Sequence, residues 1–378
     1  MIEDTKLRLD IDALEAAAAE TVNLSDFGAR YYREGLGQLL TSVKRDANLN
    51  AYGEMVLSRL LLNALENRLT LIHAQKKSPE LFAELRPPLI VMGLPRTGTT
   101  HLHRLLASDS RHRAPPFWEV VSPLPRDAQD SSSGRAHRAE EFLDLLGWSD
   151  PDIAHHIEAD LPEECRYMFA MTFESVLYWD VASVYGYLEW YKAQDRREKY
   201  REYAELLKVL QGRQSDKRLV LKEPAHTDAL DALLEAVPDA LIVQTHRDPE
   251  DQCASWCSLN HKTRKIGTDD LSREPGTRAN LDLLETMVER NLRSRERYPG
   301  RVFDVRYKDL VNDPTGVVKE IYAHYGLEYT PELSDSLERY MQENPQHKHG
   351  EHKYSLEDFG LSAEDIQRRF GDYAAEFV

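Results

Sequence analysis

"PPLIVMGLPRTGTTHLHRLLA", residues 87–107, decides the fold of this chain. Two prolines separate it from the preceding sequence, and the apolar run over 89–93 is typical of a strand that is buried on both faces of a parallel sheet. A glycine-rich turn then leads into a helical pattern over 99–109. This order predicts an anion site, because the free N–H groups and the positive dipole end of the first helical turn face the turn that precedes it.

The turn itself, "GLPRTGTT" at 93–100, has the Gly-x4-Gly spacing of a phosphate-binding loop. A nucleoside triphosphatase needs a lysine directly after the second glycine, where this chain has Thr99. The nearest cation in the loop is Arg96. We therefore expect the loop to hold one terminal phosphate, with Arg96 over the group attached to it. The alternative is a glycine-rich turn that binds no ligand.

Buried apolar runs of the same kind recur farther along the chain, and helical patterns separate them. Strands that alternate with helices indicate a parallel sheet with right-handed crossovers. The predicted fold is therefore a P-loop-type three-layer α/β fold, with a central parallel sheet flanked by helices. The predicted strands are 89–93, 218–222, 240–246 and 301–307, with 117–121 as a weaker candidate, and the further predicted helices are 227–236, 249–261 and 276–298.

The rest of the chain divides into regions of different character. Residues 1–85 read as an N-terminal helical region, and 86–378 as the α/β domain. Within that domain, 125–138 is a polar, serine-rich loop, and 160–212 is a helical insertion dense in aromatic residues. Residues 344–378 are predicted to form a C-terminal loop and helix.

Composition limits the classes of partner. The 378 residues carry 48 basic and 65 acidic side chains, a net charge of −17, which disfavours binding to nucleic acid or anionic lipid. Three cysteines without framework spacing suit a reducing compartment and are interpreted as structural thiols rather than a metal site. The acidic N-terminus does not resemble a signal peptide, and no apolar window approaches the ~18 residues of a membrane span. We therefore expect a soluble, cytoplasmic protein.

A second phosphate site is predicted in "LIVQTHRDPEDQCASW", residues 241–256. An apolar strand leads to Arg247, at the sheet edge where α/β proteins bind ligands. Asp248 and Pro249 have the character of a helix N-cap and first helical residue, and Ser255 lies about two turns along that helix. An arginine with a hydroxyl suits a phosphate. A purely structural ion pair is the alternative for Arg247.

Together the two places resemble the sulfotransferases that use 3′-phosphoadenosine 5′-phosphosulfate (PAPS). The resemblance covers roughly residues 86–360 and is closest to the branch with arginine in the loop, which includes tyrosylprotein sulfotransferases and many bacterial enzymes. It implies a 5′-phosphosulfate loop, a 3′-phosphate site and a tyrosine against the nucleotide. The implied cofactor-binding residues are Pro95, Arg96, Thr97, Gly98, Thr99, Thr100, Arg247, Ser255, Tyr307 and Lys353.

The resemblance also implies catalytic roles. Glu119, on the predicted strand 117–121, stands where the family places a catalytic glutamate that takes the acceptor proton. Arg96 and Lys222 would stabilise charge on the oxygen between sulfur and phosphate. His226, two residues beyond Pro224, is a rival base. Because the sulfate is already activated, no metal is expected, and the product would be adenosine 3′,5′-bisphosphate (PAP).

Two weaker features leave alternatives open. Glu163 and Glu164 follow a proline at a predicted helix start, where acidic residues favour the helix dipole, so either helix stability or acceptor positioning explains them. The late segment "HKHGEHK", 347–353, resembles the family's loop over the 3′-phosphate, with zinc binding as the less favoured interpretation.

The acceptor is predicted less sharply. Apolar and aromatic side chains line most ligand pockets, so the aromatic residues of 160–212 suit a small lipophilic alcohol or phenol, unless they form the core of a helical cap. A protein tyrosine and an acidic glycan are the other acceptors considered. A P-loop kinase and an inactive nucleotide-binding module are the rival functions. The N-terminal helices leave a homodimer open.

Overall fold

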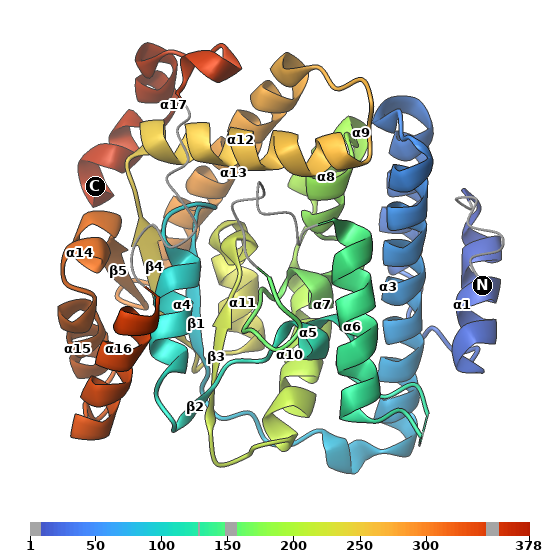
Figure 1. Cartoon of the computed structure of the whole chain (residues 1–378), viewed down its shortest axis with the longest axis horizontal. Coiled ribbons are helices and arrows are strands. Elements are labelled where there is room, and N and C mark those ends of the chain that lie inside the picture. The colour runs from blue at the N-terminus through green and yellow to red at the C-terminus, as the bar shows by residue number, and fades with distance from the viewer. Residues whose placement is uncertain (1–8, 128, 148–156, 345–354) are drawn as a thin grey trace. The chain divides into compact units, whose positions relative to one another are not determined.

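The computed structural model describes residues 9–127, 129–147, 157–344 and 355–378 (Figure 1). The chain forms two compact units, and neither is a single continuous stretch. The first unit contains residues 1–84, 116–213 and 259–272, and the second contains 85–115, 214–258 and 273–378.

The first unit is helical. The long helix α3 begins after Asn50, whose side chain accepts a hydrogen bond from the Gly53 N–H. Gly53 packs directly on Gly267, and a Cβ on Gly53 would lie 2.2 Å from the Gly267 carbonyl oxygen. This contact ties the start of α3 to the segment 259–272 of the same unit. Its other elements are α1 (Ile11–Val22), α2 (Tyr32–Ser42), the π-turn η1 (Val43–Ala47), α3 (Ala51–Lys77), η2 (Pro79–Leu81), α5 (Phe117–Val121), α6 (Ser132–Leu146), α7 (Arg166–Ala170), α8 (Leu177–Val181), α9 (Tyr185–Ala193) and α10 (Arg197–Gly212).

The aromatic residues of 160–212 form the core of this helical unit. Most of their side chains are almost completely buried, and their rings pack on one another, as in the stacked pair Phe173 and Tyr178 with centroids 5.8 Å apart. Burying large rings supplies much of the apolar area that holds such short helices together. The buried members include Tyr167, Phe169, Phe173, Tyr178, Trp179, Tyr187, Tyr191, Tyr200 and Tyr203.

The second unit contains a five-stranded parallel sheet in the order β2-β3-β1-β4-β5. Strand β1 lies between β3 and β4, so the loop that follows it lies at the middle of the sheet's carboxyl edge. Its strands are β1 (Leu89–Gly93), β2 (His112–Arg113), β3 (Arg218–Lys222), β4 (Leu241–His246) and β5 (Val302–Arg306).

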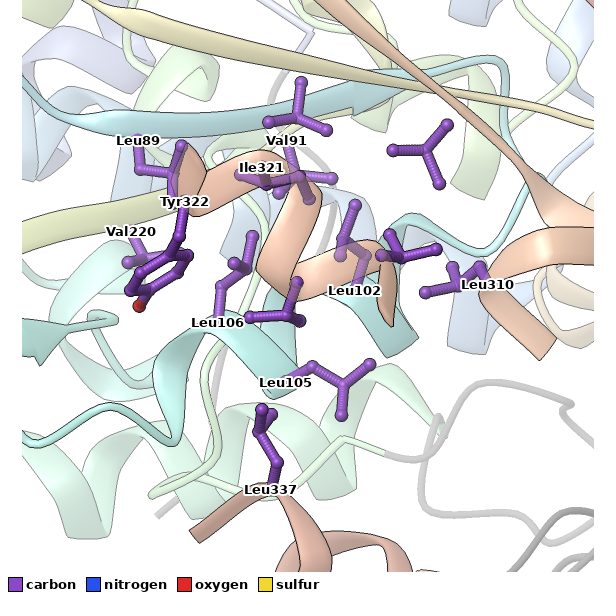
Figure 2. Close-up of a cluster of buried hydrophobic side chains, with 14 of the residues drawn as sticks. Leu89, Val91, Leu102, Leu105, Leu106, Val220, Leu310, Ile321, Tyr322 and Leu337 are labelled. Carbon is purple, nitrogen blue, oxygen red and sulfur yellow. The ribbon is translucent and has the colours of Figure 1, made fainter. Parts of the chain in front are cut away.

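Helices cover both faces of this sheet. On one face, β1 and Val243 of β4 pack with α4 and α15 in a cluster of buried leucine, valine and isoleucine side chains (Figure 2). The next residue, Gln244, points the other way and contacts Asn291 of α13. The helices are α4 (Thr99–Ala107), η3 (Pro224–Ala229), α11 (Leu230–Ala236), α12 (Pro249–Ile266, whose last turns count with the first unit), α13 (Arg273–Arg297), α14 (Tyr307–Asn312), α15 (Pro314–His324), α16 (Pro331–Glu343), η4 (Glu357–Phe359) and α17 (Ala363–Phe377).

The predicted fold class is confirmed: a central parallel sheet with helices on both faces, with helices over 1–85 and 160–212. The strand predicted at 117–121 is wrong, because "FWEVV" forms helix α5. Pro116 sets the helix start, and the N–H groups of Phe117 and Trp118 donate to the carbonyls of Leu161 and Ala159. Backbone partners outside the helix therefore overrode the strand preference of aromatic and branched residues.

Three smaller predictions also need correction. The polar segment 125–138 is a loop only at its start, because α6 begins at Ser132 with Ser131 as its N-cap. The predicted helix 227–236 begins as the 3-10 turn η3 before α11. Strand β5 is not buried on both faces, since it is an edge strand with Asp304 and Arg306 exposed.

Candidate active site

Three residues of the loop after β1 have positive φ angles: Gly93 at 143°, Arg96 at 70° and Gly98 at 92°. A Cβ on Gly93 would lie 2.5 Å from Oγ1 of Thr245, and a Cβ on Gly98 would lie 2.9 Å from the Tyr307 ring. The loop thus needs both glycines for conformation and for close packing. Gly98 is also the N-cap of α4 and supplies no side-chain cap, so the first amides of α4 keep the character of an anion site.

Arg96 has a left-handed backbone conformation that residues other than glycine seldom adopt. Two contacts stabilise it: its Nε lies 3.0 Å from Oγ of Ser255, and its carbonyl oxygen accepts a hydrogen bond from Nη1 of Arg247 at 3.3 Å. Strained residues of this kind cluster at functional sites. The predicted 5′-phosphosulfate arginine and the predicted 3′-phosphate pair are therefore in direct contact.

Helix α12 holds the loop through a residue that the sequence analysis missed. The buried Gln252 donates from Nε2 to the Pro95 carbonyl oxygen at 2.8 Å. Gln252 lies three residues before Ser255, on the same helix face, and that spacing is the signal that could have revealed it. Thr97 also fixes the loop, because its buried hydroxyl donates to the Leu94 carbonyl and contacts Oγ1 of Thr245.

Arg247 lies immediately after β4, at the carboxyl edge of the sheet. Its guanidinium carbon lies 4.5 Å from the centroid of the Tyr307 ring, and Nη2 lies 3.3 Å from Oδ2 of Asp251. Tyr307 begins α14 directly after β5, and the same ring packs against Gly98. The structure thus brings the loop, Arg247 and Tyr307 together within the second unit.

Lys222 and His226 belong to the same unit. Lys222 ends β3 next to β1, is fully buried, and donates from Nζ to Oγ1 of Thr100 at 3.2 Å. Its ammonium group therefore reaches the first turn of α4. His226 is fully buried in η3, which begins at Pro224 after that strand.

The candidate carboxylates lie in the first unit. Glu119 is buried in α5, and its Oε1 forms an ion pair with Arg213 at 2.8 Å. Glu164 pairs with Arg166, which also contacts Asp180. Burial raises the pKa of Asp180 to about 6, although Arg166 opposes the shift. Glu164 therefore shares an ion-pair group with Arg166 and Asp180.

Glu163 is buried as well, and its Oε1 accepts a hydrogen bond from the Glu164 N–H at 2.9 Å. The segment 347–353, with Lys353, lies outside the described residues.

Within residues 9–127, 129–147, 157–344 and 355–378, no group of three or more His, Cys, Asp and Glu side chains could hold a metal ion. All three cysteines are buried. No helix in those same ranges has the length and apolar character to cross a membrane.

Comparison with known proteins assigns the family. The model of the sulfotransferase family matches residues 87–331. The omega-hydroxy-beta-dihydromenaquinone-9 sulfotransferase Stf3 of Mycobacterium bovis is 25% identical over 322 residues, which are 75% of this chain and 75% of that protein.

Two solved structures are similar along nearly the whole chain. Sulfotransferase STF1 of Mycobacterium tuberculosis H37Rv is 33% identical with a TM-score of 0.84, and the match covers 98% of this chain and 100% of that one. Sulfotransferase STF9 of Mycobacterium avium is 27% identical with a TM-score of 0.84, covering 100% and 98%. The resemblance carried by the loop and by Arg247 with Ser255 is thereby confirmed, and the chain belongs to the sulfotransferase family.

Proposed function

We propose that this enzyme transfers a sulfuryl group from PAPS to the hydroxyl of a lipophilic small molecule. One observation carries the proposal: Arg96, Ser255 and Arg247 form a hydrogen-bonded cluster beside the N-terminus of α4. Such a cluster offers two cations and a helix N-terminus to a ligand with two separate phosphates. It lacks the lysine that a nucleoside triphosphate needs after Gly98.

The residues present fit the donor. The uncapped start of α4, with Thr99 and Thr100, would hold the 5′-phosphate. Gly98 has no side chain, so it can pack against the Tyr307 ring and leave the amides of this first turn open to the phosphate. Arg247 and Ser255 would bind the 3′-phosphate, and Tyr307 would lie against the nucleotide. Thr97 would contribute its backbone N–H, because its hydroxyl is used inside the protein. Pro95 has no N–H to donate, and its carbonyl accepts from Gln252, so it would shape the loop through its fixed φ.

The chemistry follows from these positions. The bond between sulfur and the bridging phosphate oxygen breaks as the acceptor oxygen bonds to sulfur, and the acceptor proton passes to a base. Arg96 and Lys222 would stabilise the negative charge that grows on the bridging oxygen. PAP leaves with that charge. PAPS brings an already activated sulfuryl group, so the proposal needs no metal.

Glu119 is the proposed base, with His226 as the rival. The ion pair between Glu119 and Arg213 supplies a counter-charge and holds the carboxylate in one orientation within its own unit. His226 is an imidazole on η3, in the same unit as the loop. Matched Glu119→Gln and His226→Gln variants separate the two: the variant of the true base loses kcat and flattens the pH–rate profile, while the other keeps that profile.

The acceptor class rests on a relative rather than on the aromatic residues. Stf3 is named for a hydroxylated menaquinone, a long lipophilic alcohol. The rings of 160–212 are core side chains of the first unit, so their abundance is no argument for an open pocket. We extend the lipophilic class, and not the particular compound, to this chain.

Calorimetric titration of PAP in EDTA, beside ATP with magnesium, tests the donor. We expect PAP to bind without metal and Arg247→Ala to weaken it strongly, because the cation of the 3′-phosphate site is gone. Arg339→Ala is the control, since Arg339 is exposed on α16 of the same unit. Preference for Mg-ATP, or equal effects of the two variants, would overturn the proposal.

A further inference from the structure

Helix α17 packs onto β4, the strand that leads to Arg247. Tyr373 and Phe377 lie against His246, the last residue of β4 and the direct neighbour of Arg247. The rings of His246 and Phe377 are stacked with centroids 4.6 Å apart and planes 9° apart. Arg369 adds ion pairs to Asp282 and Glu285 of α13, at 2.8 and 2.6 Å. None of these residues is part of the site proposed above.

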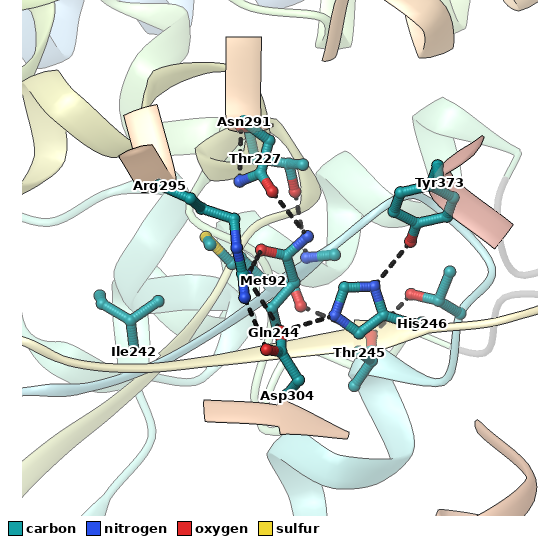
Figure 3. A network of polar contacts seen from close by, with 12 residues as sticks. Met92, Thr227, Ile242, Gln244, Thr245, His246, Asn291, Arg295, Asp304 and Tyr373 are labelled. Atoms are coloured by element: carbon teal, nitrogen blue, oxygen red, sulfur yellow. Dashed lines mark hydrogen bonds and ion pairs between the residues drawn. The ribbon is translucent and has the colours of Figure 1, made fainter. Parts of the chain in front are cut away.

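His246 is held by a hydrogen bond on each ring nitrogen (Figure 3). Its Nε2 lies 2.8 Å from Oδ1 of Asp304, and its Nδ1 lies 2.8 Å from the hydroxyl of Tyr373. A carboxylate only accepts, so Nε2 carries the proton and Nδ1 accepts from Tyr373. Burial lowers the pKa of His246, against the opposing effect of Asp304, which agrees with a neutral ring. The Asp304 carboxylate thus fixes this tautomer, and the Tyr373 hydroxyl is the donor that satisfies Nδ1.

Asp304 also accepts hydrogen bonds from Arg295 of α13. Nη1 of Arg295 lies 2.9 Å from Oδ1 of Asp304 and 3.1 Å from Oε1 of Gln244. Gln244 is fully buried in the middle of β4, and its Nε2 donates to Oδ1 of Asn291 at 3.0 Å. A buried amide with partners on both its atoms has one orientation, because turning it would place like groups together.

The last steps reach the phosphate loop. Nδ2 of Asn291 donates to the Thr227 carbonyl at 3.2 Å, and the hydroxyl of Thr227 accepts the hydrogen bond of the Gly93 N–H at 3.1 Å. Gly93 is the residue whose unusual φ begins the loop. One hydrogen-bonded network in the second unit therefore runs from α17 to the loop and passes beside Arg247 on the way.

We propose that this network positions both phosphate-binding groups, so that the docking of α17 through Tyr373 sets the affinity for the nucleotide. Thr227, Asn291, Gln244 and His246 are positioning residues in this account and do not touch the ligand. A hydrogen-bonded network whose members are satisfied holds a single arrangement, and loss of one member leaves its partners free to reorient. The inference rests on the proposed nucleotide site and adds to it residues that share no sequence motif with the loop.

Tyr373→Phe is the test, since it removes one hydroxyl and keeps the ring that packs on His246. We expect the Kd for PAP and the KM for PAPS to rise about 5-fold or more, while kcat and the KM for the acceptor stay near wild type. Hydrogen exchange of the Gly93 amide should also accelerate. Tyr322→Phe is the matched control, because it removes another buried hydroxyl of this unit, one that donates to Asp109 at 2.7 Å outside the network.

A double-mutant cycle with Thr227→Val tests transmission along the network. If the network acts as a unit, the loss of PAP affinity in the double variant is smaller than the product of the two single losses. Independent effects, or an unchanged Kd in Tyr373→Phe, would overturn the inference. Unfolding midpoints measured on each variant distinguish a specific loss of PAP affinity from a general loss of stability. A general loss of stability would change all the kinetic constants together. Failure of the wild-type protein to bind PAP would instead contradict the proposed function itself.

Discussion

Arg96 combines an unfavourable backbone conformation with the side chain that we propose stabilises the charge on the bridging oxygen. Its φ of 70° is one that glycine adopts freely, and its guanidinium contacts Ser255. Glycine at this position would remove the strain together with the cation. Stability and catalysis therefore make opposite demands on this residue.

We expect Arg96→Ala to lower kcat by ~10²-fold, by analogy with the loss of a single donor to a developing negative charge. Arg96→Gly should lose the same activity and yet raise the free energy of unfolding relative to Arg96→Ala by about 1 kcal/mol, because glycine tolerates this φ. Denaturant unfolding and steady-state kinetics check both. An Arg96→Gly variant that is less stable than Arg96→Ala would contradict the strain assigned to the backbone.

The strain at Gly98 can be separated from its packing by comparison with another glycine of the same unit. The left-handed conformation of Gly98 is shared by Gly300, where φ is 72° and a Cβ would meet nothing within 4 Å. Gly300→Ala should thus cost only backbone strain, about 1 kcal/mol. Gly98→Ala adds a clash with the Tyr307 ring, so we expect a larger loss of stability and loss of PAP binding. Equal behaviour of the two variants would show that the contact with Tyr307 is unimportant.

Among the structural elements, α4 links the loop to the core, and Asp109 holds its far end. Asp109 accepts hydrogen bonds from the Arg111 backbone and side chain and from the Tyr322 hydroxyl. Burial alone would raise its pKa, but these donors outweigh it and hold the pKa at about 2, below the ordinary 3.8. The carboxylate therefore stabilises the fold above its unfolded pKa.

The sign of the pH dependence follows. The contribution of Asp109, about 2 kcal/mol, is present above pH ~4 and is lost as the pH falls toward about 2. Asp109→Asn should lower the free energy of unfolding at neutral pH and flatten its dependence on pH in this window. Asp335→Asn, on the exposed side of α16, is the control. A slope in the Asp109→Asn protein as steep as in the wild type would refute the assignment.

Elements differ in how far the sequence predicts them. Strands β1, β3 and β4 follow from their apolar runs, because burial on both faces leaves that pattern. The two-residue β2 has no such pattern, and α5 was mistaken for a strand, because its start depends on Pro116 and on backbone partners some 40 residues away at Leu161 and Ala159. Contacts of long sequence separation decide these cases.

For the whole molecule, sequence motifs located the loop and Arg247 with Ser255, because each follows a recognisable strand and begins a helix. The network through Gln244 and Asn291 was beyond reach, since it depends on which side chains of β4 and α13 meet. Gln252 was missed, although its three-residue spacing from Ser255 on one helix face could have revealed it. The grouping of 116–213 with the N-terminal helices was likewise not visible in composition.

Transfer of a labelled sulfuryl group from donor to acceptor would demonstrate the proposed activity itself. The enzyme is incubated in EDTA with PAPS labelled in its sulfate and with a long-chain isoprenoid alcohol. We expect label in the lipid fraction, PAP formed in equal amount, and loss of both in Arg96→Ala but not in Arg339→Ala. Absence of transfer to any hydroxyl compound, together with phosphate transfer from ATP in magnesium, would contradict the account.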